Sequence, residues 1–157
     1  MRRLLPLAAI LVFLAVGAAP SFAADEKDRP ICFSLGNENY KDANKFDPGL
    51  AACSRMINSG RYKDKALAAI YRARGSWKQK KGELDASLAD YDQASRIDPT
   101  YAAAYYSRGL IYEKWHDVDK ARTEYNSAIA VPTKDRIAQW AQDNARARLK
   151  ALTEDSK

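Results

Sequence analysis

Few residues of this chain have side chains suited to nucleophilic, redox or metal chemistry: two cysteines, Cys32 and Cys53, and a single histidine, His116. An even cysteine count favours a disulfide wherever the compartment is oxidising. A bridge would close the loop between positions 32 and 53 and stabilise a small fold by about 3 kcal/mol. Two buried free thiols are the first alternative, and a catalytic thiol is the second.

The remaining polar residues do not assemble a recognisable catalytic or metal-binding motif. His116 has no acid, cysteine or second histidine placed to share a metal ion or a proton with it. Asp42 and Asn44 have the spacing that begins a calcium loop, but Phe46 and Gly49 occupy later ligand positions. The sequence also contains no phosphate-binding glycine loop and no serine nucleophile motif. We therefore expect no enzyme activity, no metal site and no cofactor.

Residues 1–23 have the organisation of a secretory signal peptide. Met1-Arg2-Arg3 is a charged start, residues 4–16 are apolar, and Ser21 and Ala23 are the small residues that a signal peptidase reads. An uncleaved membrane anchor is the alternative, but residues 4–16 fall short of the about 20 apolar residues that span a bilayer. We expect cleavage before Ala24 and export of the mature chain to the periplasm or beyond it.

The charge of the mature chain argues against nucleic acid as a partner. Losing Arg2 and Arg3 lowers the net charge from +6 to +4, and the remaining basic residues are scattered apart from a short run at 78–81. Nucleic-acid binding requires a concentrated basic stripe. We expect neither nucleic-acid binding nor stable membrane insertion, and we interpret the basic run as a solvated helix end.

An internal repeat organises the rest of the chain. Residues 68–98 recur at 102–132 with an offset of 34 residues, so that Tyr91, for example, lies over Tyr125. A helix–turn–helix unit of this length cannot bury its apolar face alone, so neighbouring units must stack. Stacking creates an extended surface, which favours a protein that binds a partner.

The periodicity of the apolar residues predicts an all-α protein. Residues on successive helical turns recur along the mature chain, and no segment alternates as a β-strand does. Asp47-Pro48 begins a helix that Gly60 ends, and Gly82 closes the next one in a left-handed conformation. The later helices are expected over 64–80, 84–96, 102–115, 118–130 and 135–152. We expect residues 24–31 to be poorly ordered and residues 36–46 to form a loop.

The two copies share a pattern of aromatic and small residues that resembles the tetratricopeptide repeat (TPR) family. The small residues allow paired helices to approach closely, and the aromatic rings fill the space between units. Around these positions the sequence is similar to exported TPR proteins of proteobacteria. The residues that carry the resemblance are Tyr71, Gly75, Tyr91, Ala94 and Pro99 in the first copy and Tyr105, Gly109, Ala121, Tyr125 and Ala128 in the second.

The resemblance implies a short right-handed α-solenoid of TPR units, closed by a capping helix. Its first unit is degenerate: the leading helix is expected to be lost and replaced by the Cys32–Cys53 bridge. The resulting domains are the signal peptide (1–23), an N-terminal extension tethered by the disulfide (24–46), the degenerate first repeat (47–67), two TPR units (68–101 and 102–134), and the capping helix with its tail (135–157).

Arginine replaces the leucine that the family has at one position of each unit. These residues are Arg74 and Arg108, and acidic residues, Asp90 and Glu124, stand at a second position of the same units. We predict an arginine–carboxylate pair inside each unit, with a ligand contact as the alternative. His116 occupies the turn position that Gly82 has in the other unit, so we expect it to adopt a left-handed backbone conformation.

In TPR arrays the first helix of each unit lines a concave groove. Carried over to this chain, the contact positions are Ala69, Arg72, Ala73, Ser76, Gln79 and Lys80 from one unit and Ala103, Tyr106, Ser107, Leu110, Glu113 and Lys114 from the next. Arg72 holds a position of the family's carboxylate clamp, but Ser76 stands where that clamp has asparagine. The mixture of positive charge and apolar area suggests an extended or helical peptide with acidic character. The alternative is that these residues are merely exposed.

We therefore expect a non-enzymatic protein–protein interaction module of the periplasm that binds a peptide or protein segment in this groove. One alternative is a structural component that associates with itself through Trp115 or Trp140. Another is an accessory subunit of a cell-envelope enzyme or assembly complex. The oligomeric state and the identity of the partner do not follow from the residues.

Overall fold

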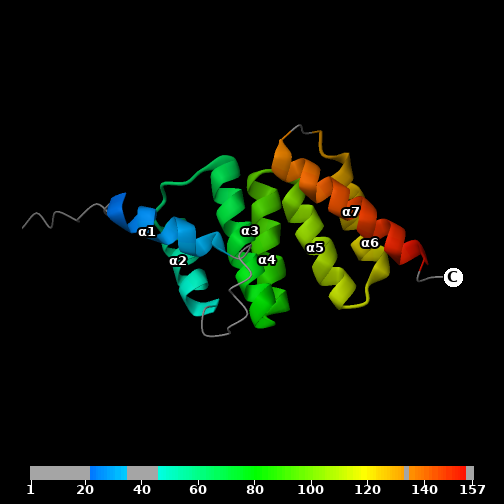
Figure 1. The fold of residues 1–157 in the computed structure, drawn as a ribbon, viewed down its shortest axis with the longest axis horizontal. Coiled ribbons are helices and arrows are strands. Elements are labelled where there is room, and N and C mark those ends of the chain that lie inside the picture. The colour runs from blue at the N-terminus through cyan, green and yellow to red at the C-terminus, as the bar shows by residue number, and fades with distance from the viewer. Residues whose placement is uncertain (1–21, 35–45, 133–134, 155–157) are drawn as a thin grey trace, which may run out of the picture.

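The computed structural model describes residues 22–34, 46–132 and 135–154. These residues form seven helices and no strand, as the all-α prediction requires (Figure 1). The helices are α1 (Phe22–Cys32), α2 (Phe46–Asn58), α3 (Asp64–Lys81), α4 (Leu84–Ile97), α5 (Ala102–Lys114), α6 (Val118–Ala130) and α7 (Arg136–Glu154).

Consecutive helices pack as pairs, and the pairs stack along the molecule. The closest packing is between α3 and α4 and between α5 and α6, the two copies of the repeat. The α1–α2 pair stacks on α3 at one end, and α7 covers α5 and α6 at the other (Figure 1). This arrangement is an all-α solenoid, and it places α1, α3, α5 and α7 as the leading helices of successive units.

The N-terminal unit differs from the prediction. Residues 24–31 were expected to be poorly ordered, but they lie in α1, and this helix supplies the leading helix that was thought to be lost. Contacts distant in sequence hold α1 in place, which its polar composition does not reveal. The predicted signal peptide lies outside the described residues up to position 21, and the predicted loop at 36–46 lies outside them up to position 45.

The turn inside each repeat unit has the same backbone hydrogen bonds. Gly82 has φ +87°, its N–H donates to Gln79, and the next N–H, that of Glu83, donates to Lys78 at 2.9 Å. His116 has φ +59°, its N–H donates to the Glu113 carbonyl at 2.9 Å, and the next N–H, that of Asp117, donates to the Tyr112 carbonyl at 2.9 Å. Both are Schellman-type helix ends, in which a left-handed residue satisfies the last carbonyls. His116 is thus a turn residue, as predicted.

The close approach of paired helices depends on glycine facing tyrosine. A Cβ atom on Gly75 would lie 2.6 Å from Cε1 of Tyr91, and one on Gly109 would lie 2.4 Å from Cε1 of Tyr125. Both tyrosines are fully buried. The space that the missing side chain leaves is therefore filled by the ring of the partner helix, which explains the pairing of these residue types in both copies.

Candidate functional site

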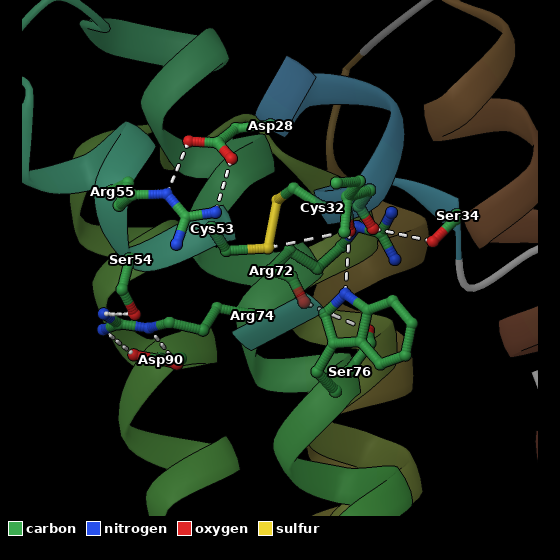
Figure 2. The surroundings of a disulfide bond; sticks show 12 residues. Asp28, Cys32, Ser34, Cys53, Ser54, Arg55, Arg72, Arg74, Ser76 and Asp90 are labelled. Carbon is green, nitrogen blue, oxygen red and sulfur yellow. Dashed lines mark hydrogen bonds and ion pairs between the residues drawn. A yellow bond between two sulfur atoms is a disulfide. The ribbon is translucent and has the colours of Figure 1, made fainter. Parts of the chain in front are cut away.

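A disulfide between Cys32 and Cys53 joins the end of α1 to the middle of α2 (Figure 2). Both residues are fully buried, and their Cα atoms are 4.9 Å apart. The indole N–H of Trp77 on α3 donates to the carbonyl oxygen of Cys32 at 2.8 Å. The predicted bridge is confirmed, and the free-thiol alternatives are wrong for this structure.

An ion pair also fastens α1 to α2. Arg55 donates to the two carboxylate oxygens of Asp28 at 2.8 and 2.6 Å (Figure 2). The Asp28 carboxylate is nearly buried, whereas Arg55 is largely exposed. Together with the disulfide and the Trp77 hydrogen bond, this pair fixes where the end of α1 lies.

The predicted arginine–carboxylate pairs are present in both repeat units. Arg74 donates to both oxygens of Asp90 at 2.9 and 2.7 Å, and Lys78 Nζ lies 2.8 Å from the same carboxylate. Arg108 donates to Glu124 at 2.9 and 2.6 Å. Each pair links the two helices of one unit with the carboxylate largely buried.

The same arginines also link neighbouring units. Arg74 donates to Ser54 Oγ on α2 at 3.4 Å, and Arg108 donates to Asp92 on α4 at 3.0 Å and to Ser95 at 3.2 Å. Each arginine therefore contacts the second helix of its own unit and the second helix of the unit before it. These contacts assign the two arginines to the scaffold and not to a ligand.

A cavity of about 1090 Å³ lies between the leading helices. We call it the groove; α3 lines it with Arg72, Ala73, Ser76, Gln79 and Lys80, and α5 lines it with Leu110 and Lys114. These seven residues all belong to the predicted ligand-contact set. The structure thus brings the central part of the predicted surface together around one cavity.

Five predicted contact residues do not line the groove: Ala69, Ala103, Tyr106, Ser107 and Glu113. For Tyr106 the reason is that α7 packs against α5 (Figure 1). Tyr106 is only 9% exposed, because its ring meets Trp140 edge-on with the centroids 5.3 Å apart. Ala103 and Ser107 are buried, and the Ser107 hydroxyl donates to the Ala103 carbonyl at 2.8 Å.

Glu113 leaves the groove because it is engaged by two other side chains. Arg148 Nε on α7 donates to it at 2.9 Å, and the hydroxyl of Tyr125 donates to the same carboxylate. Burial acts to raise the pKa of Glu113, but the hydrogen bonds from Arg148 and Tyr125 outweigh it, and the net shift is downward. Glu113 is therefore an ionised member of a link between α5, α6 and α7.

The ends of the groove come from residues that the repeat pattern did not include. The end of α1 contributes Cys32 and Phe33, and the start of α7 contributes Arg136, Ile137 and Trp140. The sequence predicted the helix that carries Ile137 and Trp140 and suggested Trp140 as a self-association contact, but it did not show which surface this helix would meet. The groove is thus bounded by the first and last helices as well as by the two repeats.

The charge of the groove is positive. Arg72, Lys80, Lys114 and Arg136 line it, and none has a carboxylate of the described residues within ion-pair distance. Arg72 instead donates from Nε to the neutral hydroxyl of Tyr101 at 3.0 Å. An anionic group entering the groove would therefore meet cations that the described part of the protein has not already neutralised.

The described residues contain no group of three or more His, Cys, Asp or Glu side chains able to hold a metal ion. Among the helices that the structure describes, none combines the length and the apolar character needed to cross a membrane. The described helices surround a concave groove, and the fold is of the helical-repeat class, in which stacked helix pairs create extended concave surfaces.

Comparison with known proteins defines the repeat more closely. A family model described as TPR repeat matches residues 80–114, and one described as tetratricopeptide repeat matches residues 102–134. The chloroplastic tetratricopeptide repeat domain-containing protein PYG7 of Arabidopsis thaliana is 25% identical over 116 residues, which are 74% of this chain and 36% of that protein. Residues 80–134 therefore match models of tetratricopeptide repeats, and the chain spans little more than a third of that relative's length.

Two solved structures share the fold. The Sgt2 TPR domain from Aspergillus fumigatus has a TM-score of 0.60 at 12% identity, covering 88% of this chain and 86% of that one. The Arabidopsis OM64 TPR domain has a TM-score of 0.54 at 18% identity, covering 80% of this chain and 98% of that one. At these identities the likeness establishes the fold, and the all-α TPR solenoid expected from the sequence is confirmed.

Proposed function

We propose that this chain is a non-enzymatic TPR adaptor of the periplasm that binds a segment of another protein in its groove. The single observation that carries the proposal is the cavity between α1, α3, α5 and α7, seven of whose lining residues are the ones that the repeat pattern assigns to ligand contact. Concave surfaces built from leading helices suit an extended or helical segment. Export rests on the signal-peptide pattern of residues 1–23 and on the buried disulfide, which persists in oxidising compartments.

Site-specific photo-crosslinking in living cells tests the binding site. A crosslinking residue is placed at Ser76, in the groove, and in a second strain at Arg96, which is exposed on α4 outside it. We expect a discrete crosslinked protein from position 76 and none from position 96. Equal crosslinking at the two positions, or none at position 76, would overturn the assignment of the groove.

The location is tested separately from the binding site. Osmotic shock should release the mature protein, and mass spectrometry should find Ala24 as its first residue. A chain that stays with the cytoplasmic fraction and keeps Met1 would refute export while leaving the groove assignment untouched.

Self-association is the second candidate, because Trp140 and Ile137 are about half exposed on the helix that ends the stack. In that case the crosslink from Ser76 would be a dimer of this chain, and sedimentation would show a mass that rises with concentration. A monomer over the whole concentration range would exclude it. An accessory role beside a cell-envelope enzyme would instead be seen as a crosslink to that enzyme.

A further inference from the structure

The groove gathers several cations that have no carboxylate partner among the described residues. Elsewhere Arg74, Arg108 and Arg148 are each matched by a carboxylate at hydrogen-bond distance. Lys80 and Lys114, which occupy equivalent positions of α3 and α5, have no such partner among the described residues. The one acidic side chain expected on this surface is turned away, because it is held by α7. The groove therefore surrounds a concave space with cations that no carboxylate of the described ranges neutralises.

The exposed apolar side chains gather at the same place. Five large hydrophobic residues are exposed in the described part of the chain, and three of them line the groove: Phe33 (40%), Ile137 (50%) and Trp140 (49%). Phe33 follows the disulfide-held end of α1, whereas Ile137 and Trp140 begin α7. The edge-on contact with Tyr106 fixes the Trp140 ring, so that its exposed part is positioned before any ligand arrives.

The cations and the exposed apolar side chains line the same groove. The cations Arg72 and Lys80 come from α3 and Lys114 from α5, and the same cavity is lined by apolar side chains from the residue after α1 and from α7. A ligand that matches both features must carry negative charge and apolar side chains within one short stretch. The size of the cavity, about 1090 Å³, exceeds what a single anion fills and suits several residues of a chain.

We infer that the groove of this chain binds an acidic protein segment that carries an aromatic or large aliphatic side chain beside its carboxylates. The carboxylates contact the cationic residues of α3 and α5, and the apolar side chain packs against Trp140 and Ile137 or against Phe33. This inference rests on the proposed function, since it specifies the chemistry of the segment that the groove accepts. A membrane surface is disfavoured because the site is concave and bounded by four helices. Nucleic acid is disfavoured because the basic residues of the sequence are scattered apart from the short run at 78–81.

The test uses the mature full-length protein and a random peptide library displayed on phage. We expect the selected peptides to be enriched in Asp and Glu next to Phe, Trp, Tyr, Leu or Ile. A representative peptide is then synthesised in four forms: as selected, with its carboxylates amidated, with its apolar residue changed to serine, and with every acid changed to lysine. Fluorescence anisotropy should show an affinity loss of about tenfold or more for the second and third forms, and binding that weakens as salt is raised.

Reversing the charge of two groove lysines tests the role of the cations most directly. K80E/K114E changes two exposed side chains of the groove, and K63E/K150E makes the same change at exposed positions outside it. The first variant should lose the acidic peptide and gain affinity for the lysine form, while the second should bind as the parent does. I137S, at an exposed position, should weaken the selected peptide without changing its salt dependence, and thermal unfolding shows that each variant is folded.

The outcomes separate the inference from the proposed function. Selected peptides without acidic enrichment, or an unchanged affinity for K80E/K114E, would overturn the inference although the groove still binds protein. No selected peptide together with no crosslink from position 76 would overturn both. Displacement of the selected peptide by vesicles of anionic phospholipid or by duplex DNA, at concentrations where neutral vesicles have no effect, would also overturn the inference in favour of those ligands.

Discussion

The buried carboxylate of Asp90 offers a direct test of how the repeat units are held together. Its side chain is 4% exposed and accepts from Arg74 at 2.9 and 2.7 Å, with Lys78 2.8 Å away. In Asp90→Asn the side chain keeps its size but loses its charge, so two cations remain around a neutral amide. The substitution therefore removes the anion and leaves the packing almost unchanged.

The expected loss in the free energy of unfolding follows from the burial of Arg74 and Lys78, the two cations that remain. Removing one partner of a fully buried ion pair costs about 3–5 kcal/mol, because the other charge is left uncompensated. Arg74 and Lys78 are about one-fifth exposed, so water screens part of that penalty. We therefore expect a loss of about 2–3 kcal/mol, a discounted form of the buried-pair value. For a chain of this size that is a fall in Tm of about 4–12 °C.

Urea and thermal unfolding followed by circular dichroism measure this loss. The matched control is Asp143→Asn, which breaks an exposed pair with Arg146 on α7 and should change stability by less than about 0.5 kcal/mol. Lys78→Met should cost less than Asp90→Asn, because the Arg74 pair survives it. The reasoning is refuted if Asp90→Asn melts with the parent protein, or if it costs no more than the surface control.

Three further perturbations test the packing, the disulfide and the α7 contact. Gly109→Ala should destabilise the fold by about 1–3 kcal/mol in urea unfolding, because its Cβ would lie 2.4 Å from a buried tyrosine ring; an unchanged midpoint would contradict the close packing. Cys32→Ser/Cys53→Ser should lose about 3 kcal/mol and become insensitive to dithiothreitol, whereas the parent should lose a similar amount on reduction; equal stability of the reduced and oxidised parent would exclude this role. The depressed pKa of Glu113 means that its contribution is present above the ordinary value of 4.5 and is lost as pH falls through the depressed value. The stability gap between the parent and Arg148→Gln should therefore narrow as a series of urea unfolding curves is taken from neutral to acidic pH, and a constant gap would refute the link.

The repeat itself was predictable because its determinants are local. The 34-residue offset, the glycine–tyrosine pairs and the turn residues all lie within one unit, so α3 to α6 begin and end within one or two residues of their predicted bounds. The arginine–carboxylate pairs could also be predicted, since two unusual residues replaced apolar ones at facing positions. In each case the sequence separation is small and the helical geometry sets the contact.

The N-terminal helix was missed for the opposite reason. Residues 24–31 are mostly polar, with Pro30 inside the segment, and local preferences disfavour a helix there. What stabilises α1 is the disulfide to Cys53, the Asp28–Arg55 pair and the hydrogen bond from Trp77, whose partners lie 21 to 45 residues apart in sequence. Contacts of that range are not visible in local composition, and they appear only once the helices are assembled.

The groove, too, could be predicted from the sequence only in part. Its α3 and α5 residues follow from the repeat, but its ends depend on where α1 and α7 are held. Trp140 illustrates the point: the sequence placed it in the capping helix, yet its contact with Tyr106 depends on how α7 packs against α5. Because the same two terminal helices seal the core and bound the groove, a two-repeat array can present a concave site that its repeats alone would leave open at both ends. For the segment proposed above, the cationic contacts come from the repeats, whereas the apolar contacts are expected at the two ends of the groove, at Phe33 just after α1 and at Ile137 and Trp140 of α7.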